Sequence, residues 1–136
     1  MNRTLFDQEG LAVAYIAPDF HETIYLWEGL PVAYLHEEKH VYGVNGRHLA
    51  WLIDGVIFNH NGERVGFLSG TCPVPPGKEP AKGKKCPIAE IRPRWHAPPL
   101  PALTFNFGCE DLAQFLREGE VPLLNEEAPF SPLPDS

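Results

Sequence analysis

One five-residue segment has the residue types and spacing of a zinc-peptidase motif: HEEKH at 36–40 fits the pattern H-E-x-x-H. In zinc peptidases the two histidines lie one helical turn apart, so both bind one metal ion, and the glutamate acts as the base. That chemistry requires a helix at 36–40, and no recognisable third-ligand motif follows in the chain. Whether the surrounding residues form a helix therefore decides whether HEEKH is a metal site.

Four segments around HEEKH share one pattern centred on a glycine. They are TLFDQEGLAVAYI (4–16), TIYLWEGLPVAYL (23–35), HVYGVNGRHLAWL (40–52) and VIFNHNGERVGFL (56–68). In each copy an aliphatic and an aromatic residue precede the glycine, and a small residue, a ring and an aliphatic residue follow it. The glycines are Gly10, Gly29, Gly46 and Gly62, and the small residues are Ala14, Ala33, Ala50 and Gly66.

Each copy predicts a β-hairpin, because two short runs rich in β-branched and aromatic residues flank a tight turn. Glycine in third place of the turn suits a type I turn followed by an αL residue, with a G1 bulge. The Asn-Gly pairs at 45–46 and 61–62 would also permit a type I′ turn, so the turn type stays open. The recurring small residue predicts a close approach between neighbouring units, where a bulkier side chain would cost about 1–3 kcal/mol.

HEEKH falls between the second and third copies of this repeat. Leu35 closes the second copy and Val41 belongs to the third, so 36–39 is predicted to be a connector and His40 to start a strand. We therefore expect no metal site and no zinc catalysis here. The other histidines belong to different segments, and we expect all six to be scattered surface or half-buried residues: His21, His36, His40, His48, His60 and His96.

Connectors of six, four and three residues make successive hairpins neighbours. One hairpin is only marginally stable alone, but four hairpins can share a hydrophobic core. Two mainly β architectures follow: four hairpins about a pseudo-fourfold axis, or an eight-stranded meander or barrel. The pattern over 4–68 resembles the bacterial family described as the four-fold β-flower. The resemblance implies the radial arrangement, and it implies no catalytic residue because no activity is established for that family.

The second half of the chain has a different composition. Residues 69–87 are rich in Pro, Gly and Lys and predict an exposed loop. Cys72 and Cys86 bracket this loop and could form a bridge, but the odd cysteine number favours three reduced thiols. Residues 88–107 predict an extended proline-rich segment that packs on the protein's own aromatic side chains or serves as a partner's ligand. Within it, IAEI at 88–91 could form a short strand.

The only predicted helix covers residues 108–119, where Leu112, Phe115 and Leu116 form an apolar stripe. We expect this helix to dock on the sheet and close one face of the core. Residues 1–119 are therefore predicted to form a single domain. The Pro- and acid-rich residues 120–136 are predicted to be a partly disordered tail.

The overall charge excludes some classes of partner. The 136 residues include 11 Lys plus Arg against 18 Asp plus Glu, for a net charge of −7. A nucleic-acid binder or an anionic-membrane binder would need a basic face, so we expect neither partner. No apolar run reaches the length of about 18 residues that a membrane span needs, and the N-terminus lacks a signal-peptide pattern. A cytoplasmic location is the expectation.

No phosphate-binding loop, dinucleotide-binding motif or nucleophile elbow occurs in the sequence. We therefore expect a non-catalytic protein without a cofactor, which mediates protein interaction or self-association. Candidate contact residues are Trp27 in the second hairpin turn, and Trp95 and His96 in the proline-rich segment. The alternative is a ligand-binding or enzymatic module with a pocket where the hairpins converge, lined by Tyr34 and Trp51.

Overall fold

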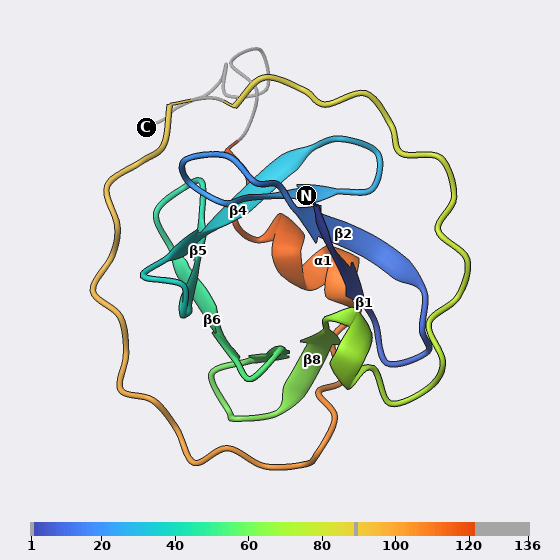
Figure 1. The fold of residues 1–136 in the computed structure, drawn as a ribbon. Helices are drawn as coiled ribbons and strands as arrows, with labels where there is room; N and C mark the ends of the chain where they lie inside the picture. The colour runs from blue at the N-terminus through green and yellow to red at the C-terminus, as the bar shows by residue number, and fades with distance from the viewer. Residues whose placement is uncertain (1, 89, 122–136) are drawn as a thin grey trace.

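The computed structural model describes residues 2–88 and 90–121, which form a closed antiparallel barrel of eight strands (Figure 1). Each strand pairs with the next, and the eighth closes on the first. The strands are β1 (Arg3–Phe6), β2 (Ala12–Ile16), β3 (Thr23–Leu26), β4 (Pro31–His36), β5 (His40–Gly43), β6 (His48–Ile53), β7 (Val56–Phe58) and β8 (Arg64–Phe67). The predicted hairpins are confirmed. The two predicted architectures describe the same structure, because the four hairpins follow one another as a meander that closes into the barrel.

The hairpin turns have the conformation that the recurring glycine favours. Gly10, Gly29, Gly46 and Gly62 have φ values of 83°, 104°, 94° and 78°. Each glycine N–H donates to the carbonyl three residues earlier, and in each hairpin the register shifts just before the turn. Asn45 and Asn61 do not adopt positive φ. The turns are therefore type I with a G1 bulge, and type I′ is excluded.

HEEKH is a strand connector, as predicted. Strand β4 ends at His36, strand β5 begins at His40, and these two residues are cross-strand partners. Glu37 and Glu38 turn the chain with φ values of 57° and 58°, and the Lys39 N–H donates to the His36 carbonyl at 3.2 Å. The helical geometry of a zinc peptidase is absent. Within residues 2–88 and 90–121 no group of three or more His, Cys, Asp or Glu side chains is arranged to hold a metal ion.

Helix α1 (Leu112–Arg117) lies inside the ring of strands, near β2 and β4 in Figure 1, and its buried side chains join the aliphatic core of the barrel. The helix is shorter than the predicted 108–119, because Asp111 is the N-cap and accepts a hydrogen bond from the Gln114 N–H. The recurring small residues face this core: a Cβ added at Gly66 would lie 3.1 Å from Leu112 Cδ1. The small residue at Gly66 therefore allows a close approach to helix α1. The predicted close approach between neighbouring hairpins is not observed at this position.

The opposite faces of the strands carry a second, aromatic layer. Alternation along a strand places the ring column on the outer wall while the aliphatic column faces the helix. One ring from each hairpin is the cross-strand partner of a ring from the next, so each junction between hairpins holds a pair. The pairs are Tyr15–Tyr25, Tyr34–Tyr42, Trp51–Phe58 and Phe67–Phe6.

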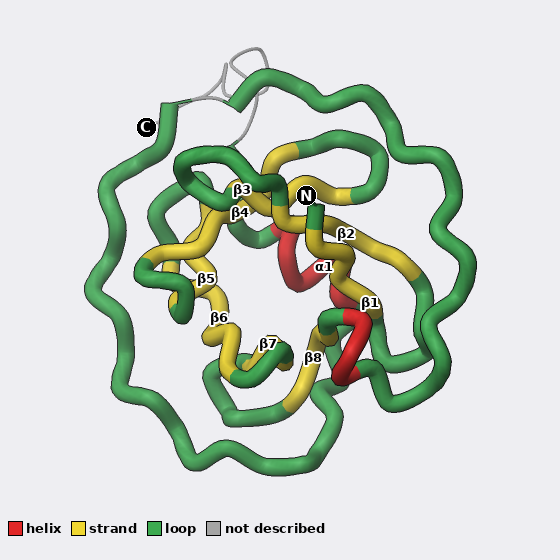
Figure 2. The backbone as a smooth tube through the Cα atoms, viewed as in Figure 1, coloured by secondary structure: helices red, strands yellow, loops and turns green. Residues whose placement is uncertain are grey.

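Residues 72–88 and 90–107, which we name the belt, run in an extended conformation around the outside of the barrel (Figures 1 and 2). The belt passes the four hairpin tips in order, and at each tip a belt N–H donates to the carbonyl of the turn glycine at 2.8–3.0 Å. The donors follow one another at intervals of nine residues: Gly77, Cys86, Trp95 and Thr104. The belt packs so tightly on the tips that a Cβ at Gly46 would lie 2.1 Å from the Pro93 carbonyl oxygen.

The belt bears on three predictions about the second half of the chain. Residues 69–87 are largely exposed and form no helix or strand beyond a short 3₁₀ turn at Ser69–Thr71, and from residue 72 onward they make up the first half of the belt. The described residues of 88–91 form no strand. Cys72, Cys86 and Cys109 are free, so no bridge closes the base of the belt.

The predicted tail lies outside the described residues, apart from Glu120 and Val121. No helix in the described part of the chain combines the length and the apolar character that crossing a bilayer requires.

Candidate functional site

Three histidines from the third and fourth hairpins form a hydrogen-bonded chain on the outer wall of the barrel. His40 Nδ1 lies 3.0 Å from His48 Nε2, and His48 Nδ1 lies 3.0 Å from His60 Nε2. We name these three residues the histidine chain. His48 uses both ring nitrogens inside it, so the chain links His40 at one end to His60 at the other.

Strand register brings these residues together. His40 begins β5, and His48 begins β6 as the cross-strand partner of Tyr42. His60 lies in the turn that follows β7, and its ring is stacked on His48 at a centroid distance of 5.2 Å. Trp51 packs against both rings, at 4.7 Å from His48 and 5.4 Å from His60.

The expectation of scattered histidines is wrong for these three residues. His36 also lies beside the chain, with its ring centre 6.2 Å from that of His40. His48 stands where the other hairpins have Ala12, Pro31 and Arg64, and His60 stands where they have Gln8, Trp27 and Val44. The one signal in the sequence is that both histidines replace unrelated residue types at variable positions of the repeat. Their proximity depends on the pairing of β6 with β7, which the repeat pattern alone does not define.

Burial keeps the histidine chain uncharged near neutral pH. His48 is only 6% exposed, and burial, with the nearby His60 and His40, lowers its pKa from 6.5 to about 4. Burial also lowers the pKa of His40 and of His60. A neutral imidazole has one donor and one acceptor nitrogen, so the two hydrogen bonds can run in either direction along the chain. Reversing them exchanges donor and acceptor at the outer nitrogens of His40 and His60.

A pocket of about 200 Å³ opens at the His60 end of the chain. We name it the histidine pocket. It is lined by Arg47, His48, Leu49, Asn59, His60, Asn61, Glu110, Phe115 and Glu118. Its walls come from the tips of the third and fourth hairpins and from residues in and around helix α1, so it lies at the rim of the barrel and not at its centre.

Next to this region the belt exposes a run of large apolar side chains, which we name the apolar arc. Trp95 is 59% exposed and Phe105 is 87% exposed. The members are Trp95, Leu100, Leu103, Phe105 and Phe107. The barrel anchors both ends of the arc: the Tyr42 hydroxyl donates to the Trp95 carbonyl at 3.0 Å, and the Arg64 guanidinium lies 4.3 Å from the centre of the Phe107 ring.

Comparison with protein families decides the assignment of the fold. The family model described as 4-fold beta flower protein matches residues 3–116. The chain belongs to this family. Comparison with curated proteins and with solved structures gives no match. Membership of the beta flower family therefore establishes the fold and leaves the function to the site itself.

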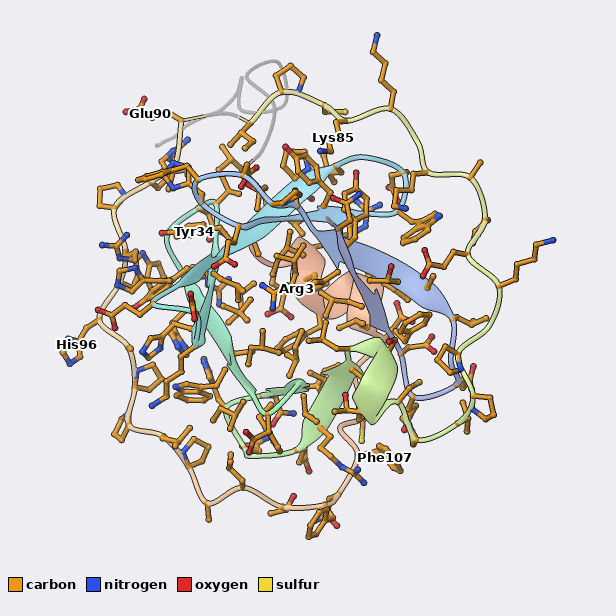
Figure 3. All side chains as sticks on the ribbon, in the orientation of Figure 1. Arg3, Tyr34, Lys85, Glu90, His96 and Phe107 are labelled. Atoms are coloured by element: carbon orange, nitrogen blue, oxygen red, sulfur yellow. The ribbon has the colours of Figure 1, made fainter. Side chains whose placement is uncertain are left out.

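In this beta flower, the predicted site residues do not gather in one place. Trp27 is partly buried, and its Nε1–H donates to the Pro80 carbonyl of the belt at 3.1 Å. Its ring also lies 4.5 Å from Lys82 Nζ, so Trp27 holds the belt and does not contact Trp95. His96 projects outward from the belt, away from the barrel (Figure 3). Only Trp95 of the predicted contact residues belongs to the apolar arc.

The two residues predicted to line a pocket where the hairpins converge lie apart from helix α1. Tyr34 and Trp51 are buried in the outer aromatic layer, and helix α1 lies inside the ring of strands. Tyr34 instead borders an open pocket of about 360 Å³, shared with His21 and Arg94. Trp51 supports the histidine chain from β6.

Proposed function

We propose that this protein is a non-catalytic interaction module that binds a protein partner through the apolar arc. The observation that carries the proposal is the exposure of five large apolar side chains within 13 residues of the belt, from Trp95 to Phe107. Large exposed apolar side chains that gather in one region of a protein often mark protein–protein contact sites. The packed core supports the same function, because aliphatic side chains of the strands and of helix α1 pack together inside the barrel.

The backbone beneath the arc is already fixed, which lowers the cost of binding. The Trp95 N–H donates to the Gly46 carbonyl at 2.8 Å, and the Thr104 N–H donates to the Gly62 carbonyl at 3.0 Å. The Arg64 N–H donates to the Asn106 carbonyl at 2.8 Å. A surface held in its bound conformation loses less entropy on association than a flexible segment does.

Charge favours a foreign partner over a second copy. Residues 91–109 contain Arg92 and Arg94 and no Asp or Glu, whereas the whole chain has a net charge of −7. Two copies joined arc to arc about a twofold axis would place like charges together. A partner with an apolar groove and an acidic rim would complement both features of the arc.

As part of the proposal, the module works in the bacterial cytoplasm and contacts neither nucleic acid nor membrane. Three free cysteines agree with a reducing compartment, where disulfides are rare. The acidic balance of the chain disfavours binding to anionic polymers and lipids.

Site-specific photo-crosslinking in cells tests the proposal. A photoreactive phenylalanine analogue at position 105 is compared with the same analogue at Phe20, which is 94% exposed on the connector between β2 and β3. We expect a protein that is captured from position 105 and not from position 20. That protein, once purified, should bind the F105D variant at least about tenfold more weakly than wild type and bind F20D normally.

Two outcomes would overturn the proposal. One is capture of the same proteins from both positions, which would mean that exposure alone explains the crosslinks. The other is a captured partner whose affinity is the same for F105D and wild type. Light scattering on the purified protein separates self-association: we expect a monomer at all concentrations, and a dimer that F105D disrupts would replace the foreign partner by a second copy.

A further inference from the structure

The histidine pocket adjoins the apolar arc at Arg47, whose guanidinium lies 5.5 Å from the centre of the Trp95 ring, and is built from four parts of the chain. Arg47 and Asn61 come from the tips of the third and fourth hairpins. Glu110 precedes helix α1, and Glu118 is its C-cap. His60 brings the end of the histidine chain into the same cavity. The pocket therefore gathers one cation, two carboxylates and an imidazole within about 200 Å³.

Several of these polar groups are available to a ligand. Among the described residues, His60 Nδ1 makes no hydrogen bond, because the contact to His48 uses Nε2. The guanidinium of Arg47 lies 5.5 Å from the centre of the Trp95 ring, and a cation in such a contact keeps its N–H donors for a ligand carboxylate. The carboxylate of Glu118 makes no hydrogen bond or ion pair within the described part of the chain. Both charges lie close enough to His60 to shift its pKa in opposite directions, Glu118 upward and Arg47 downward.

The remaining wall is ordered and partly apolar. The Glu110 carboxylate accepts from Asn59 Nδ2 at 3.1 Å, which fixes its position in the pocket. Leu49 and Phe115 are buried members of the core that border the cavity. A ligand would therefore meet charged groups on one side and an aliphatic and aromatic surface on the other.

We propose that the histidine pocket binds a small zwitterion of the α-amino-acid class. The ligand's carboxylate pairs with Arg47, its ammonium group pairs with Glu118 and Glu110, and its side chain packs on the apolar wall. One positive and two negative protein charges reject a dicarboxylate and accept a neutral or cationic amino acid. Because the histidine chain can reverse its hydrogen bonds, His60 Nδ1 can donate to the carboxylate or accept from the ammonium group.

The size of the cavity is consistent with this class of ligand. Pockets for drug-sized molecules are usually about 300–1,000 Å³, so a pocket of about 200 Å³ suits a smaller molecule. A pocket that small gives few contacts, and we expect dissociation constants in the region of 1 mM.

Nuclear magnetic resonance of the histidine ring nitrogens in the full chain tests the proposal. Each of the 20 common L-amino acids is added at up to about 10 mM, well above the expected dissociation constant. At least one should shift the His60 ring signals saturably and leave the signals of His96, out on the belt, unchanged. The amide of that amino acid lacks the carboxylate, and its N-acetyl derivative lacks the ammonium group; each should bind at least about tenfold more weakly.

Two substitutions connect the result to the pocket. R47Q and E118Q remove single charges at the rim, and neither residue belongs to the buried core, so both variants should keep the backbone spectrum of the wild type. Each should weaken the zwitterion at least about tenfold, while R117Q, which changes the helix C-terminus outside the pocket, should not. No saturable shift with any amino acid, or equal affinity for the zwitterion and its two derivatives, would overturn the proposal.

This result is independent of the interaction module proposed above. The F105D variant should retain amino-acid binding, and E118Q should retain partner crosslinking from position 105. Loss of both functions in either variant would contradict the separation of the two sites.

Discussion

The ring of hairpins and the belt both repeat four times, but the hairpin repeat is one of side chains and the belt repeat is one of backbone hydrogen bonds. In the hairpins the repeat is visible in the side chains, because the same positions face the same core or the same aromatic layer. In the belt the repeat is a backbone spacing of nine residues between the N–H groups that meet the turn glycines. The four residues that donate these bonds have no side-chain property in common: Gly77, Cys86, Trp95 and Thr104.

This difference has a physical cause and a functional consequence. A buried side chain is restricted in size and polarity, whereas any residue except proline supplies a backbone N–H. The belt can therefore keep its course while its side chains vary around the ring. Lys85 and Arg94 stand nine residues apart and place cationic groups 5.1 Å from the Tyr25 ring and 5.9 Å from the Tyr42 ring. Figure 3 shows Lys85 turned toward the barrel, while His96 points away from it.

One leucine-to-alanine substitution in each region gives the largest expected contrast. Leu116 of helix α1 is fully buried in the barrel core, and L116A should lower the free energy of unfolding by about 2–5 kcal/mol. Leu100 of the belt is 46% exposed, and L100A should change the free energy of unfolding by less than about 0.5 kcal/mol. Urea unfolding followed by tryptophan fluorescence measures both values. Similar losses in the two variants would show that the belt carries core packing of its own.

The histidine chain predicts a pH dependence that belongs to the ring and not to the belt. The pKa of His48 is about 4 in the folded protein against 6.5 for an unperturbed histidine, so the unfolded state binds the proton first. The contribution of neutral His48 to the free energy of unfolding is therefore fully present above pH 6.5 and is lost as the pH drops toward 4. At about 1.4 kcal/mol per pKa unit, the loss is on the order of 3 kcal/mol.

Two glutamine variants isolate this contribution from the carboxylates that also titrate in acid. The difference in free energy of unfolding between wild type and H48Q should shrink between pH 6.5 and pH 4. In this range His48 of the wild type takes up a proton in the unfolded state, which H48Q cannot do. H96Q, at an exposed belt position, should follow the wild-type curve throughout. The free energy of unfolding is measured by urea titration at each pH. Parallel curves for wild type and H48Q would contradict a buried neutral His48.

The sequence predicts the ring of hairpins well, because the contacts within the ring require the same side-chain types at the same position of each hairpin. The recurring glycine predicts both the hairpins and the G1 bulge, and its φ of 78° at Gly62 confirms the conformation. The identity of HEEKH follows from the same pattern, since the copies on either side leave only a connector between them. The helix was predicted four residues too long at its start, although Asp111 followed by Gln114 is a recognisable N-cap signal.

The belt and the histidine chain could not be predicted in the same way. The course of the belt depends on hydrogen bonds from backbone groups, which every residue but proline possesses, so its composition indicates only an exposed segment. The histidine chain depends on the register between neighbouring hairpins. His48 and His60 are 12 residues apart, and only the pairing of β6 with β7 turns that separation into a 3.0 Å contact.

A belt residue that binds a hairpin tip through its backbone N–H should tolerate a change of side chain. It should not tolerate replacement by proline, which removes the N–H. Cys86 is exposed, and its N–H donates to the Gly29 carbonyl at 2.9 Å. C86S keeps this donor and should change the free energy of unfolding by less than about 0.5 kcal/mol. C86P removes the donor and should cost about 0.5–1.5 kcal/mol, the usual contribution of one hydrogen bond.

Hydrogen exchange locates the effect of these two variants within the molecule. In C86P the amide of Gly83, which donates to the Trp27 carbonyl at 2.9 Å, should exchange faster than in wild type, because the belt is released from the tip of the second hairpin. In C86S it should exchange at the wild-type rate. The amide of Trp95, bound to the next tip at Gly46, should be unaffected in both variants, since each tip holds the belt through its own hydrogen bond. Equal destabilisation by serine and proline would mean that the Cys86 side chain holds the belt, and the contrast between a side-chain repeat and a backbone repeat would fail at this position.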